Sequence, residues 1–423
     1  MSLNDHIANK LIMKKPILFL IVFFISVVCN SQSSKQDIID NIYLSGGSLT
    51  AYTGPLQDTL TPSPIGKKPF YISTYCRHGS RHFMEANYYT APIDALKAAK
   101  NAGALTNFGN QILERMEIMN ENSLNRYGEL TKIGLDQWQG IAKRMIRNFP
   151  EIFTDSSSVD GRSSIFIRCI LSMETLLQEL KAFNPQLKIF HDACENDMSF
   201  ILPGYSPSKA STRNEAPIAK TIALPTINGD RIAEEFFSKQ YIKKINTSNF
   251  MLYLFDLASQ IQNTELRDSF SLYEIFNDDE LYDVWKRKNV SAYNSYHKGG
   301  STGVLLKRIL DDADKAIANN SPCAHFRFGH ESVLLPLVCK MSLNNYDKEY
   351  DSVEELEAAN WKTYRIYPMA SNIQIIFYRS SPSDSDILVK ILLNEGEVTL
   401  PIDTDIPPYY HWNDVREYWK NKQ

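Results

Sequence analysis

The sequence is poor in cysteine, and none of its cysteines stands in a metal-binding arrangement. Six cysteines occur in 423 residues, with no Cys-x-x-Cys pair and no zinc-ligand spacing between cysteine and histidine, so a structural zinc site is not indicated. A chain of this length needs no disulfide framework to stabilise its core. Beyond the N-terminal segment an odd number remains, which leaves at least one free thiol: Cys76, Cys169, Cys194, Cys323 and Cys339.

Net charge is also small, and the sequence contains no internal repeats and no low-complexity blocks. The formal net charge is −4, which argues against a general nucleic-acid-binding protein. An anionic ligand would therefore need a local basic pocket, because the composition does not provide a basic surface. With 43% hydrophobic and 22% charged residues, the composition is that of a globular protein with one large domain or two smaller ones.

No apolar run is long enough for a comfortable transmembrane helix, but the N-terminus has the pattern of an export signal. Two lysines precede the apolar run 17–28, which has the length of a signal-peptide core. We expect residues 1–31 to be a signal peptide, with Met13 as the true start. Cys29 leaves a second alternative open, a lipid anchor at a lipoprotein-type site. Either alternative predicts export, to the periplasm, the outer membrane or the surroundings of a bacterium.

One short stretch concentrates reactive and charged side chains. A strand-like run, 69–75, leads into the sequence Arg-His-Gly-Ser-Arg at 77–81. Glycine permits a tight bend and a close approach of backbone N–H groups to a ligand, and each arginine offers a fork of donors that matches phosphate oxygens. His78, between Arg77 and Arg81, could attack phosphorus through a ring nitrogen. The alternative is a basic turn after a strand, without a catalytic role.

The spacing Arg-His-Gly-x-Arg resembles the signature of the histidine phosphatase superfamily, although Phe83 stands where many relatives have proline. A second stretch, Gly-x-Leu-Thr-x-x-Gly at 128–134, resembles the histidine acid phosphatases. Behind it, apolar residues recur at helical spacing from Ile133 to Phe149. We expect Thr131 to cap the N-terminus of this helix.

A histidine and a carboxylate follow far along the chain, at a second strand-to-helix turn. The predicted strand 324–328 is followed by Gly329, His330 and Glu331, which open the predicted helix 332–341. Acid phosphatases and phytases of the resembled family carry His-Asp here, and multiple inositol polyphosphate phosphatases carry His-Ala-Glu, whereas this sequence has His-Glu-Ser. A glutamate that only stabilises a helix N-terminus is the alternative without catalysis.

A third arginine follows the predicted buried strand 164–167. Arg168 would lie at the C-terminal edge of the sheet, where open α/β sheets bind ligands, and in the resembled family an arginine at this place completes the phosphate pocket. An ordinary arginine at a strand end is the alternative. If Arg77 and Arg168 converge, we expect their strands to be neighbours. The adjacent Cys76 and Cys169 would then face away from the site into the helices, buried and unbridged.

The order of the elements predicts an α/β fold with a mostly parallel central sheet flanked by helices. No strand pattern interrupts 200–318, so we expect a mainly helical cap inserted between the core segments 32–199 and 319–423. The C-terminal third resembles the multiple inositol polyphosphate phosphatases at 367–379 and 393–395. The remaining predicted elements are a helix over 91–120 with a break near Gly103, a turn at Asp160-Gly161, a helix over 172–183, a strand over 188–191, and a closing hairpin of strands 373–378 and 387–393.

The resemblance implies a complete phosphatase site. Four side chains would bind the phosphoryl group: Arg77, Arg81, Arg168 and His330. His78 would attack phosphorus, and Glu331 would protonate the leaving oxygen and then activate water. No metal or other cofactor is expected, because the arginines neutralise the charge of the phosphate.

The sequence therefore predicts an exported, metal-independent phosphomonoesterase that hydrolyses inositol polyphosphates such as phytate through a phosphohistidine intermediate. A broad-specificity histidine acid phosphatase and an inactive phosphate-ester-binding protein stay open as alternatives. A phosphomutase is disfavoured, because its intracellular substrate would not meet an exported protein. The expected partner is a small phosphate monoester, with no nucleic acid and no membrane span.

Overall fold

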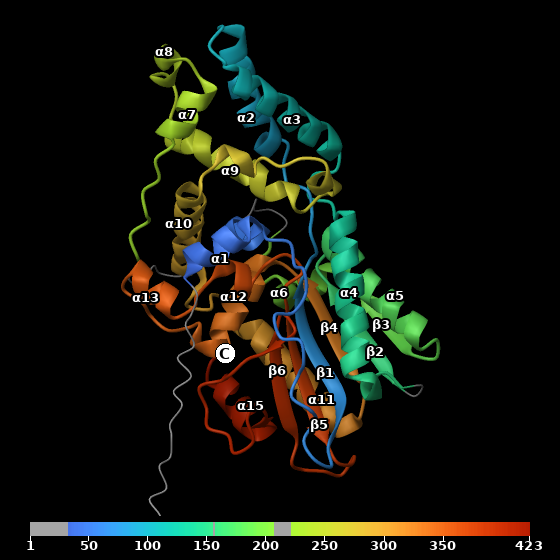
Figure 1. Ribbon diagram of the computed structural model, residues 1–423. Coiled ribbons are helices and arrows are strands. Elements are labelled where there is room, and N and C mark those ends of the chain that lie inside the picture. The colour runs from blue at the N-terminus through green and yellow to red at the C-terminus, as the bar shows by residue number, and fades with distance from the viewer. Residues whose placement is uncertain (1–32, 155–156, 207–220) are drawn as a thin grey trace, which may run out of the picture. The chain divides into compact units, whose positions relative to one another are not determined.

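A computed structural model describes residues 33–154, 157–206 and 221–423, so the predicted signal peptide and Cys29 lie outside the described residues. The described strands form one sheet in the order β3-β2-β4-β1-β5-β6-β7, with β8 paired to β6 (Figure 1). The strands β3, β2, β4 and β1 are parallel, and β5, β6 and β7 continue the sheet antiparallel. This confirms the predicted α/β class and the closing hairpin. The strands are β1 (Lys68–Arg77), β2 (Ser158–Ser163), β3 (Lys188–Asp192), β4 (Ala324–Gly329), β5 (Asn372–Arg379), β6 (Leu388–Leu393), β7 (Gly396–Glu397) and β8 (Tyr410–His411).

The helices between these strands follow the predicted periodicity closely. The predicted break near Gly103 is confirmed, because Gly103 has a φ of +62° and separates α2 from α3. None of the described helices is both long and apolar enough to cross a membrane. The helices are α1 (Ser34–Asp40), α2 (Asn87–Asn101), α3 (Asn107–Ser123), α4 (Lys132–Asn148), α5 (Ile167–Phe183), α6 (Met198–Ile201), α7 (Asp230–Phe236), α8 (Lys239–Ile242), α9 (Thr247–Ile261), α10 (Asp278–Tyr296), α11 (Gly303–Asn319), α12 (Glu331–Lys340), α13 (Val353–Ala358), α14 (Thr363–Ile366) and α15 (Trp412–Lys420).

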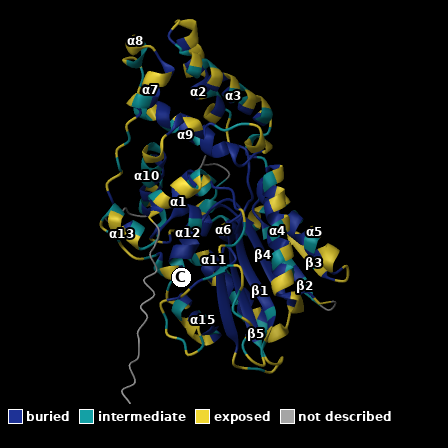
Figure 2. Ribbon diagram, viewed as in Figure 1, coloured by how far each residue is buried: buried dark blue, intermediate teal, exposed yellow. Residues whose placement is uncertain are grey.

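Both faces of the sheet are covered by helices. Successive side chains of β1 point to opposite faces, so Tyr71 and Tyr75 pack with α11, α12 and α15, whereas Ile72 and Cys76 pack with α4 and α5. Figure 2 shows the central strands as buried along most of their length. Strands buried on both faces are apolar at nearly every position, which is why 69–75 could be predicted as a strand.

A third hydrophobic cluster joins helices from two distant parts of the sequence. Residues of α2 and α3 pack with residues of α7, α9 and α10, and Figure 1 shows α2, α3, α7 and α9 together, away from the strands. By contrast, α11 packs with the cluster on the sheet. The division into a core and a cap inserted at 200–318 stays a prediction.

The predicted strand over 164–167 is wrong, as is the turn at Asp160-Gly161. The strand β2 lies earlier, and Gly161 is inside it. A Cβ at Gly161 would lie 3.2 Å from the side chains of Met173 and Leu177, so glycine here lets α5 pack closely over the strand. Ile167 is the first residue of α5 and is 58% exposed, so the apolar run that suggested a buried strand is a loop and a helix start.

We expected the strands that precede Arg77 and Arg168 to be neighbours in the sheet, and this prediction is also wrong. Arg168 lies in the first turn of α5 and not at a strand end. The strand β4 pairs with both β1 and β2 and therefore separates them. His330, which follows β4, consequently comes to lie between the segments that carry Arg77 and Arg168.

The start of α4 packs directly against the loop after β1. Thr131 caps this helix as predicted, because its hydroxyl accepts a bond from the Gly134 N–H at 3.3 Å. The Thr131 N–H also donates to the Ser80 carbonyl at 2.9 Å. A Cβ at Gly79 would lie 2.7 Å from the Cα of Gly134, and one at Gly134 would lie 2.8 Å from the Ser80 nitrogen. Glycine at both positions therefore allows two backbones to touch.

We predict that Gly134→Ala lowers the free energy of unfolding by about 2–3 kcal/mol, because the added methyl group forces α4 away from the loop. Gly140→Ala is the matched control in the same helix, where the new Cβ meets only the flexible end of the Arg144 side chain. That control should be neutral or stabilise by up to about 1 kcal/mol. Thermal unfolding of the purified variants measures both effects. Equal effects would show that the contact with the loop does not matter.

Candidate active site

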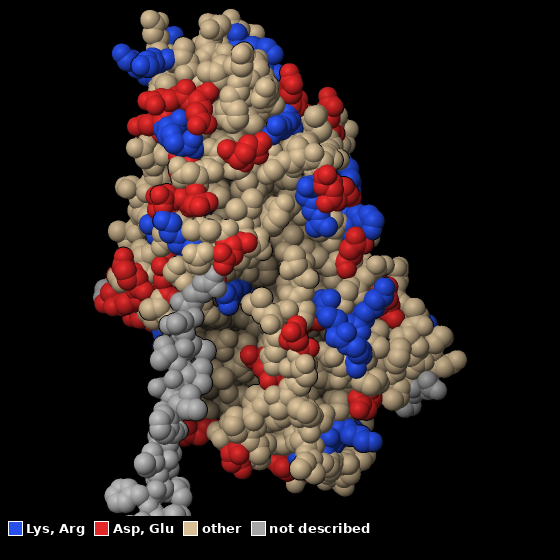
Figure 3. Space-filling model, in the orientation of Figure 1, with Lys and Arg blue, Asp and Glu red and all other residues tan. Residues whose placement is uncertain are grey.

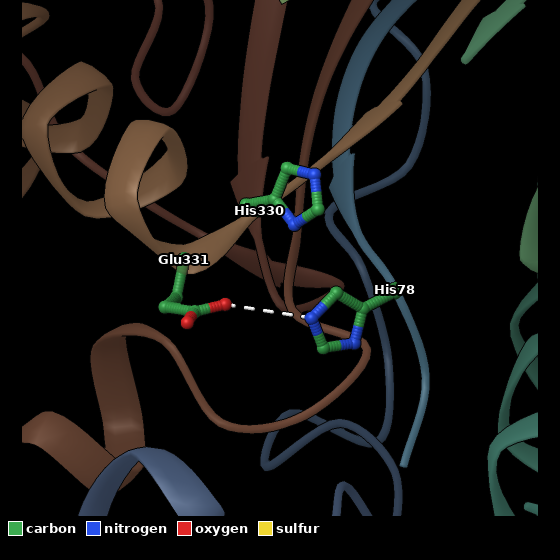
Figure 4. A group of neighbouring side chains, drawn as sticks. All are labelled: His78, His330 and Glu331. Atoms are coloured by element: carbon green, nitrogen blue, oxygen red, sulfur yellow. Dashed lines mark ion pairs between the residues drawn. The ribbon is translucent and has the colours of Figure 1, made fainter. Parts of the chain in front are cut away.

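His78 follows β1 directly, and its hydrogen bonds fix which ring nitrogen carries the proton. The His78 N–H donates to the Gly329 carbonyl at 3.1 Å, which joins the ends of β1 and β4. The ring Nδ1 lies 2.9 Å from the Gly79 carbonyl. Because a carbonyl only accepts, Nδ1 carries the hydrogen and Nε2 carries the lone pair. That Nε2 faces the Glu331 Oε2 at 3.4 Å (Figure 4).

The surroundings of His78 keep its ring neutral. Burial lowers the pKa of His78 to about 3, and the positive charges of Arg168 and Arg77 act in the same direction, against the opposing effect of Glu331. At pH 5–8 the imidazole is therefore uncharged. A neutral imidazole with a free lone pair on Nε2 is the form that can attack phosphorus.

Arg77 is the most deeply buried of the three arginines. It is 1% exposed, and its Nη1 donates to the carbonyls of Ser48 at 2.7 Å and Tyr367 at 2.8 Å. Its Nε lies 3.3 Å from the Glu331 Oε2. Two carbonyls from segments far apart in the sequence thus hold one side of the guanidinium, and the Nε side faces Glu331. No sequence pattern could have assigned this role to Ser48.

Arg81 lies in the loop between β1 and α2 and is also buried. Its Nη1 donates to the His82 carbonyl at 2.9 Å. Burial lowers the pKa of Arg81 to about 10, and the positive charges of Arg168 and Arg77 add to this effect, while Glu331 opposes it. The group nevertheless stays protonated at physiological pH. Its charge is therefore available to an anion.

Arg168 enters the site from the first turn of α5. Its Nη2 lies 3.3 Å from the His330 Nδ1, and its guanidinium carbon lies 4.8 Å from the centre of the Phe166 ring. A guanidinium over an aromatic face gains a cation–π attraction. Arg168 was predicted at a strand end and lies in a helix, yet its side chain does contact His330.

His330 is the N-cap residue of α12 and follows β4 directly. Arg168 can only donate, so the His330 Nδ1 accepts, and Nε2 carries the hydrogen that faces the Ser164 Oγ at 3.1 Å. Burial lowers the pKa of His330 well below its usual value, and Arg168 and His78 add to this effect. The His330 N–H donates to the Tyr75 hydroxyl at 3.3 Å. His330 is therefore a neutral residue that is held at both ring nitrogens and at its main-chain N–H.

Glu331 is the first residue of α12, and its side chain is one-third exposed (33%). Burial raises the pKa of its carboxyl, but the positive charges of Arg77 and Arg81 outweigh burial and hold the pKa well below its usual value. The carboxyl is therefore ionised in the ligand-free protein. The N-terminus of a helix also favours a negative charge at this position.

The six side chains that the sequence singled out lie together, and most leave a buried polar atom without a hydrogen-bond partner in the described residues. Buried unpaired polar atoms are rare and costly in proteins. Here they belong to neighbouring side chains, as is typical of a site that a ligand completes. The atoms are Arg77 Nε, His78 Nε2, Arg81 Nε, Arg168 Nε and Glu331 Oε2.

Three of these side chains have the composition of a metal site. One ligand atom each from His78, His330 and Glu331 lies within 4.8 Å of the others. However, Arg77 contacts the carboxylate and Arg168 contacts the second imidazole. Guanidinium groups at this distance repel a cation and attract an anion. On the molecular face seen in Figure 3, Lys and Arg alternate with Asp and Glu, so the site itself provides the concentrated positive charge.

The two cysteines beside the arginines differ in their surroundings. Both are buried and unbridged, as predicted. Cys76 packs into the helix layer of α4 and α5. The prediction that Cys169 faces away from the site is wrong, because its Sγ donates to the Gly329 carbonyl at 3.2 Å and lies 3.7 Å from the His330 Nε2. The reason is that Cys169 is on a helix and not on a strand.

Comparisons with known proteins show the family of the chain and agree with its fold. The sequence model of the histidine phosphatase superfamily (branch 2) matches residues 74–394. The multiple inositol polyphosphate phosphatase of Bifidobacterium longum, solved with inositol hexasulfate, has 16% identity and a TM-score of 0.71, covering 89% of this chain and 97% of that one. Its complex with phosphate gives a TM-score of 0.72. The phytase of D. castellii has 14% identity and a TM-score of 0.65, covering 90% and 85%. No curated protein matches. At these identities the likeness shows the fold.

We predict that Cys76 and Cys169 resist iodoacetamide in the native protein. Burial raises the pKa of Cys76 to about 12 and that of Cys169 to about 11, so neither forms the reactive thiolate. The half-buried Cys194 is the internal control and should be alkylated first. Peptide mass spectrometry before and after denaturation measures each site. Native labelling of Cys169 would contradict its packing against His330.

Proposed function

The chain belongs to branch 2 of the histidine phosphatase superfamily and is a phosphatase, and we propose that it hydrolyses inositol polyphosphates such as phytate through a phosphohistidine on His78. The observation that carries the proposal is that Arg77, Arg81 and Arg168 each leave a buried Nε donor without a hydrogen bond and that their charges act in one pocket with a neutral His78. Three positive charges around a neutral nucleophile suit a dianionic phosphate monoester.

In the first step, the arginines and His330 would bind the oxygens of the phosphoryl group. The lone pair of the His78 Nε2 would attack phosphorus in line with the ester oxygen, forming a P–N bond as the P–O bond breaks. The leaving alkoxide would take a proton from Glu331. The bound arginines supply the positive charge that Mg²⁺ supplies in other phosphoryl-transfer enzymes.

In the second step, Glu331 would act as a carboxylate. It would accept a proton from a water molecule, whose oxygen attacks the phosphohistidine. The P–N bond breaks, phosphate leaves, and His78 returns to its neutral state. Glu331 ends this step protonated, as it began the first, so the two steps balance in protons. Once phosphate has left, Glu331 would return this proton to solvent, because its pKa is low in the ligand-free protein, and it would take up a proton again when the next substrate binds.

The substrate class is supported by two observations. Solved structures with this fold include a multiple inositol polyphosphate phosphatase in complex with inositol hexasulfate and a phytase. The segments 367–379 and 393–395 resemble multiple inositol polyphosphate phosphatases, and Tyr367 and Ser371 accept hydrogen bonds from Arg77. We also propose export, on the basis of the signal pattern at 1–31. The alternative is an exported protein that carries a lipid anchor on Cys29.

Product analysis tests this function. The purified protein is incubated with phytate in the presence of EDTA, and the inositol phosphates are separated by ion chromatography, beside a parallel assay with p-nitrophenyl phosphate. We expect stepwise loss of phosphate from phytate, unaffected by the chelator. Turnover of p-nitrophenyl phosphate alone would favour the broad-specificity alternative, and no turnover of either would favour an inactive binding protein. Activity lost with EDTA and restored by a divalent ion would contradict the arginine-based mechanism.

We predict that His78→Ala lowers kcat by at least about a thousandfold, as the loss of a covalent nucleophile typically does. The parent incubated with labelled substrate and quenched with alkali should carry phosphohistidine, and the variant should not. His82→Ala is the matched control, because His82 is also buried but bonds to Ser123. Trapped phosphohistidine in the His78 variant would contradict the assignment of the nucleophile.

We predict that Glu331→Gln slows phosphorylation by phytate by about a hundredfold or more, the usual contribution of a general acid. An inositol alkoxide is a poor leaving group, whereas p-nitrophenolate leaves without a proton, so the burst with p-nitrophenyl phosphate should be nearly unchanged. Rapid-quench and burst kinetics measure the two rates. Equal losses for both substrates would mean that another residue is the acid.

The pH dependence provides a second measurement on the same residue. A general acid acts in its protonated form, so the rate of phosphorylation by phytate should fall as pH rises through the pKa of Glu331 in the substrate complex. Glutamine does not titrate, so this limb should be absent in Glu331→Gln. A limb that persists in the variant would belong to a different group.

A further inference from the structure

Three buried amide side chains lie together at the C-terminal end of α9, outside the set of residues that would contact the substrate. They are Gln260, Gln262 and Asn263, each at most 3% exposed. In Figure 1, α9 runs beside α2 and ends near the start of α4. Burying an amide is costly unless its polar atoms are hydrogen-bonded, so the partners of these amides indicate what the helix end holds in place.

Two of the amides hold the loop that carries Arg81. The Gln260 Nε2 donates to the Arg81 carbonyl at 2.6 Å. The Ser80 hydroxyl donates to the Asn263 Oδ1, also at 2.6 Å. The end of α9 therefore fixes two consecutive residues of the loop, one through its main chain and one through its side chain.

The other end of the Asn263 amide reaches the segment that holds Arg77. The Asn263 Nδ2 donates to the Leu49 carbonyl at 2.7 Å. The preceding carbonyl, that of Ser48, accepts from the Arg77 Nη1 at 2.7 Å. A single amide thus connects the loop of Arg81 to the turn that binds Arg77.

The side-chain amide of Gln137, on α4, fixes which atoms donate and which accept in these bonds. The Ser80 N–H donates to the Gln137 Oε1 at 2.9 Å, and the Gln137 Nε2 donates to the Ser80 Oγ at 3.0 Å. The Ser80 hydroxyl has one hydrogen, which is therefore available only to Asn263. The hydrogen bonds from Gln137 through Ser80 and Asn263 to Leu49 form one connected series. The main-chain N–H of Ser80 fixes the donor and the acceptor of every bond in it, so neither amide can be turned over without losing a bond.

We propose that Asn263 is a positioning residue for the phosphatase reaction: it sets the spacing between Arg77 and Arg81, and Gln260 supports it. This inference rests on the proposed binding of the phosphoryl group by these arginines. The two guanidiniums repel each other, so their spacing must be imposed from outside. A displacement of about 1 Å in a catalytic group costs on the order of a hundredfold in rate.

The variants are Asn263→Ala and, as matched control, Gln262→Ala. Gln262 is a buried amide at the same helix end, and its Oε1 accepts from the Ala51 N–H at 2.9 Å, but neither of its ends reaches the loop of Ser80 and Arg81. The readouts are kcat/KM for phytate and for p-nitrophenyl phosphate, the Kd of inorganic phosphate by calorimetry, and thermal unfolding.

We expect Asn263→Ala to lower kcat/KM for both substrates by the same factor, about ten- to a hundredfold, and to weaken phosphate binding. Equal losses of kcat/KM for phytate and p-nitrophenyl phosphate would indicate a defect in phosphate positioning, because loss of the general acid should affect phytate much more. Gln262→Ala should lower kcat/KM by less than about threefold at a comparable loss of thermal stability. Equal kinetic losses in both variants would overturn the proposal, since stability alone would then explain them.

Two further variants keep the proposal testable if Asn263→Ala folds poorly. Ser80→Ala removes the hydroxyl that donates to Asn263 and introduces no charge, so it should show a kinetic loss with a smaller loss of stability. In a double-mutant cycle, Ser80→Ala and Asn263→Ser should be non-additive, because the shorter serine cannot join Ser80 to Leu49 and both substitutions interrupt the same series of hydrogen bonds. Parental activity in Ser80→Ala, or full additivity, would overturn the proposal. Failure of the parent to turn over any phosphate ester would instead contradict the proposed function.

Discussion

Three buried guanidinium groups in one pocket impose the main constraint on this structure. Like charges removed from water repel each other and lose hydration, and the lowered pKa of Arg81 reflects that cost. Backbone carbonyls offset part of it, because those of Ser48 and Tyr367 accept from Arg77 and that of His82 accepts from Arg81. These bonds leave the Nε atoms of the arginines without a hydrogen bond, although the Arg77 Nε has an ion pair with Glu331. Such a pocket favours an anionic ligand.

Burial and the same positive charge keep the rings of His78 and His330 neutral. Burial lowers the pKa of both His78 and His330, and Arg168 lowers both further. A protonated His78 could not attack phosphorus, so the groups that would bind the substrate also maintain the nucleophile. His330 is likewise kept neutral by burial and by Arg168. The proposed binding of phosphate and the proposed nucleophilic attack would therefore depend on the same buried positive charges.

Local sequence predicted those parts of the site that a few neighbouring residues determine. The strand before His78, the helix cap at Thr131 and the turn at His330 all have short-range signals, since glycine, capping and periodicity act over a single turn. Arg168 was assigned to the wrong element because an apolar loop and a buried strand have the same composition. The partners of the arginines were not predictable, because a carbonyl such as that of Ser48 has no signature in the sequence.

The ionised state of Glu331 in the free protein is compatible with its proposed role as an acid. Its carboxylate contacts the Arg77 Nε and the His78 Nε2, which are atoms that the phosphoryl group would need. Binding of the substrate would therefore displace the carboxylate from both. Loss of the contact with Arg77 and the approach of a dianion each raise the pKa of the carboxyl group. The substrate itself would thus prepare the proton donor, and once the alkoxide has left with that proton, the carboxylate is again in the state that can activate water.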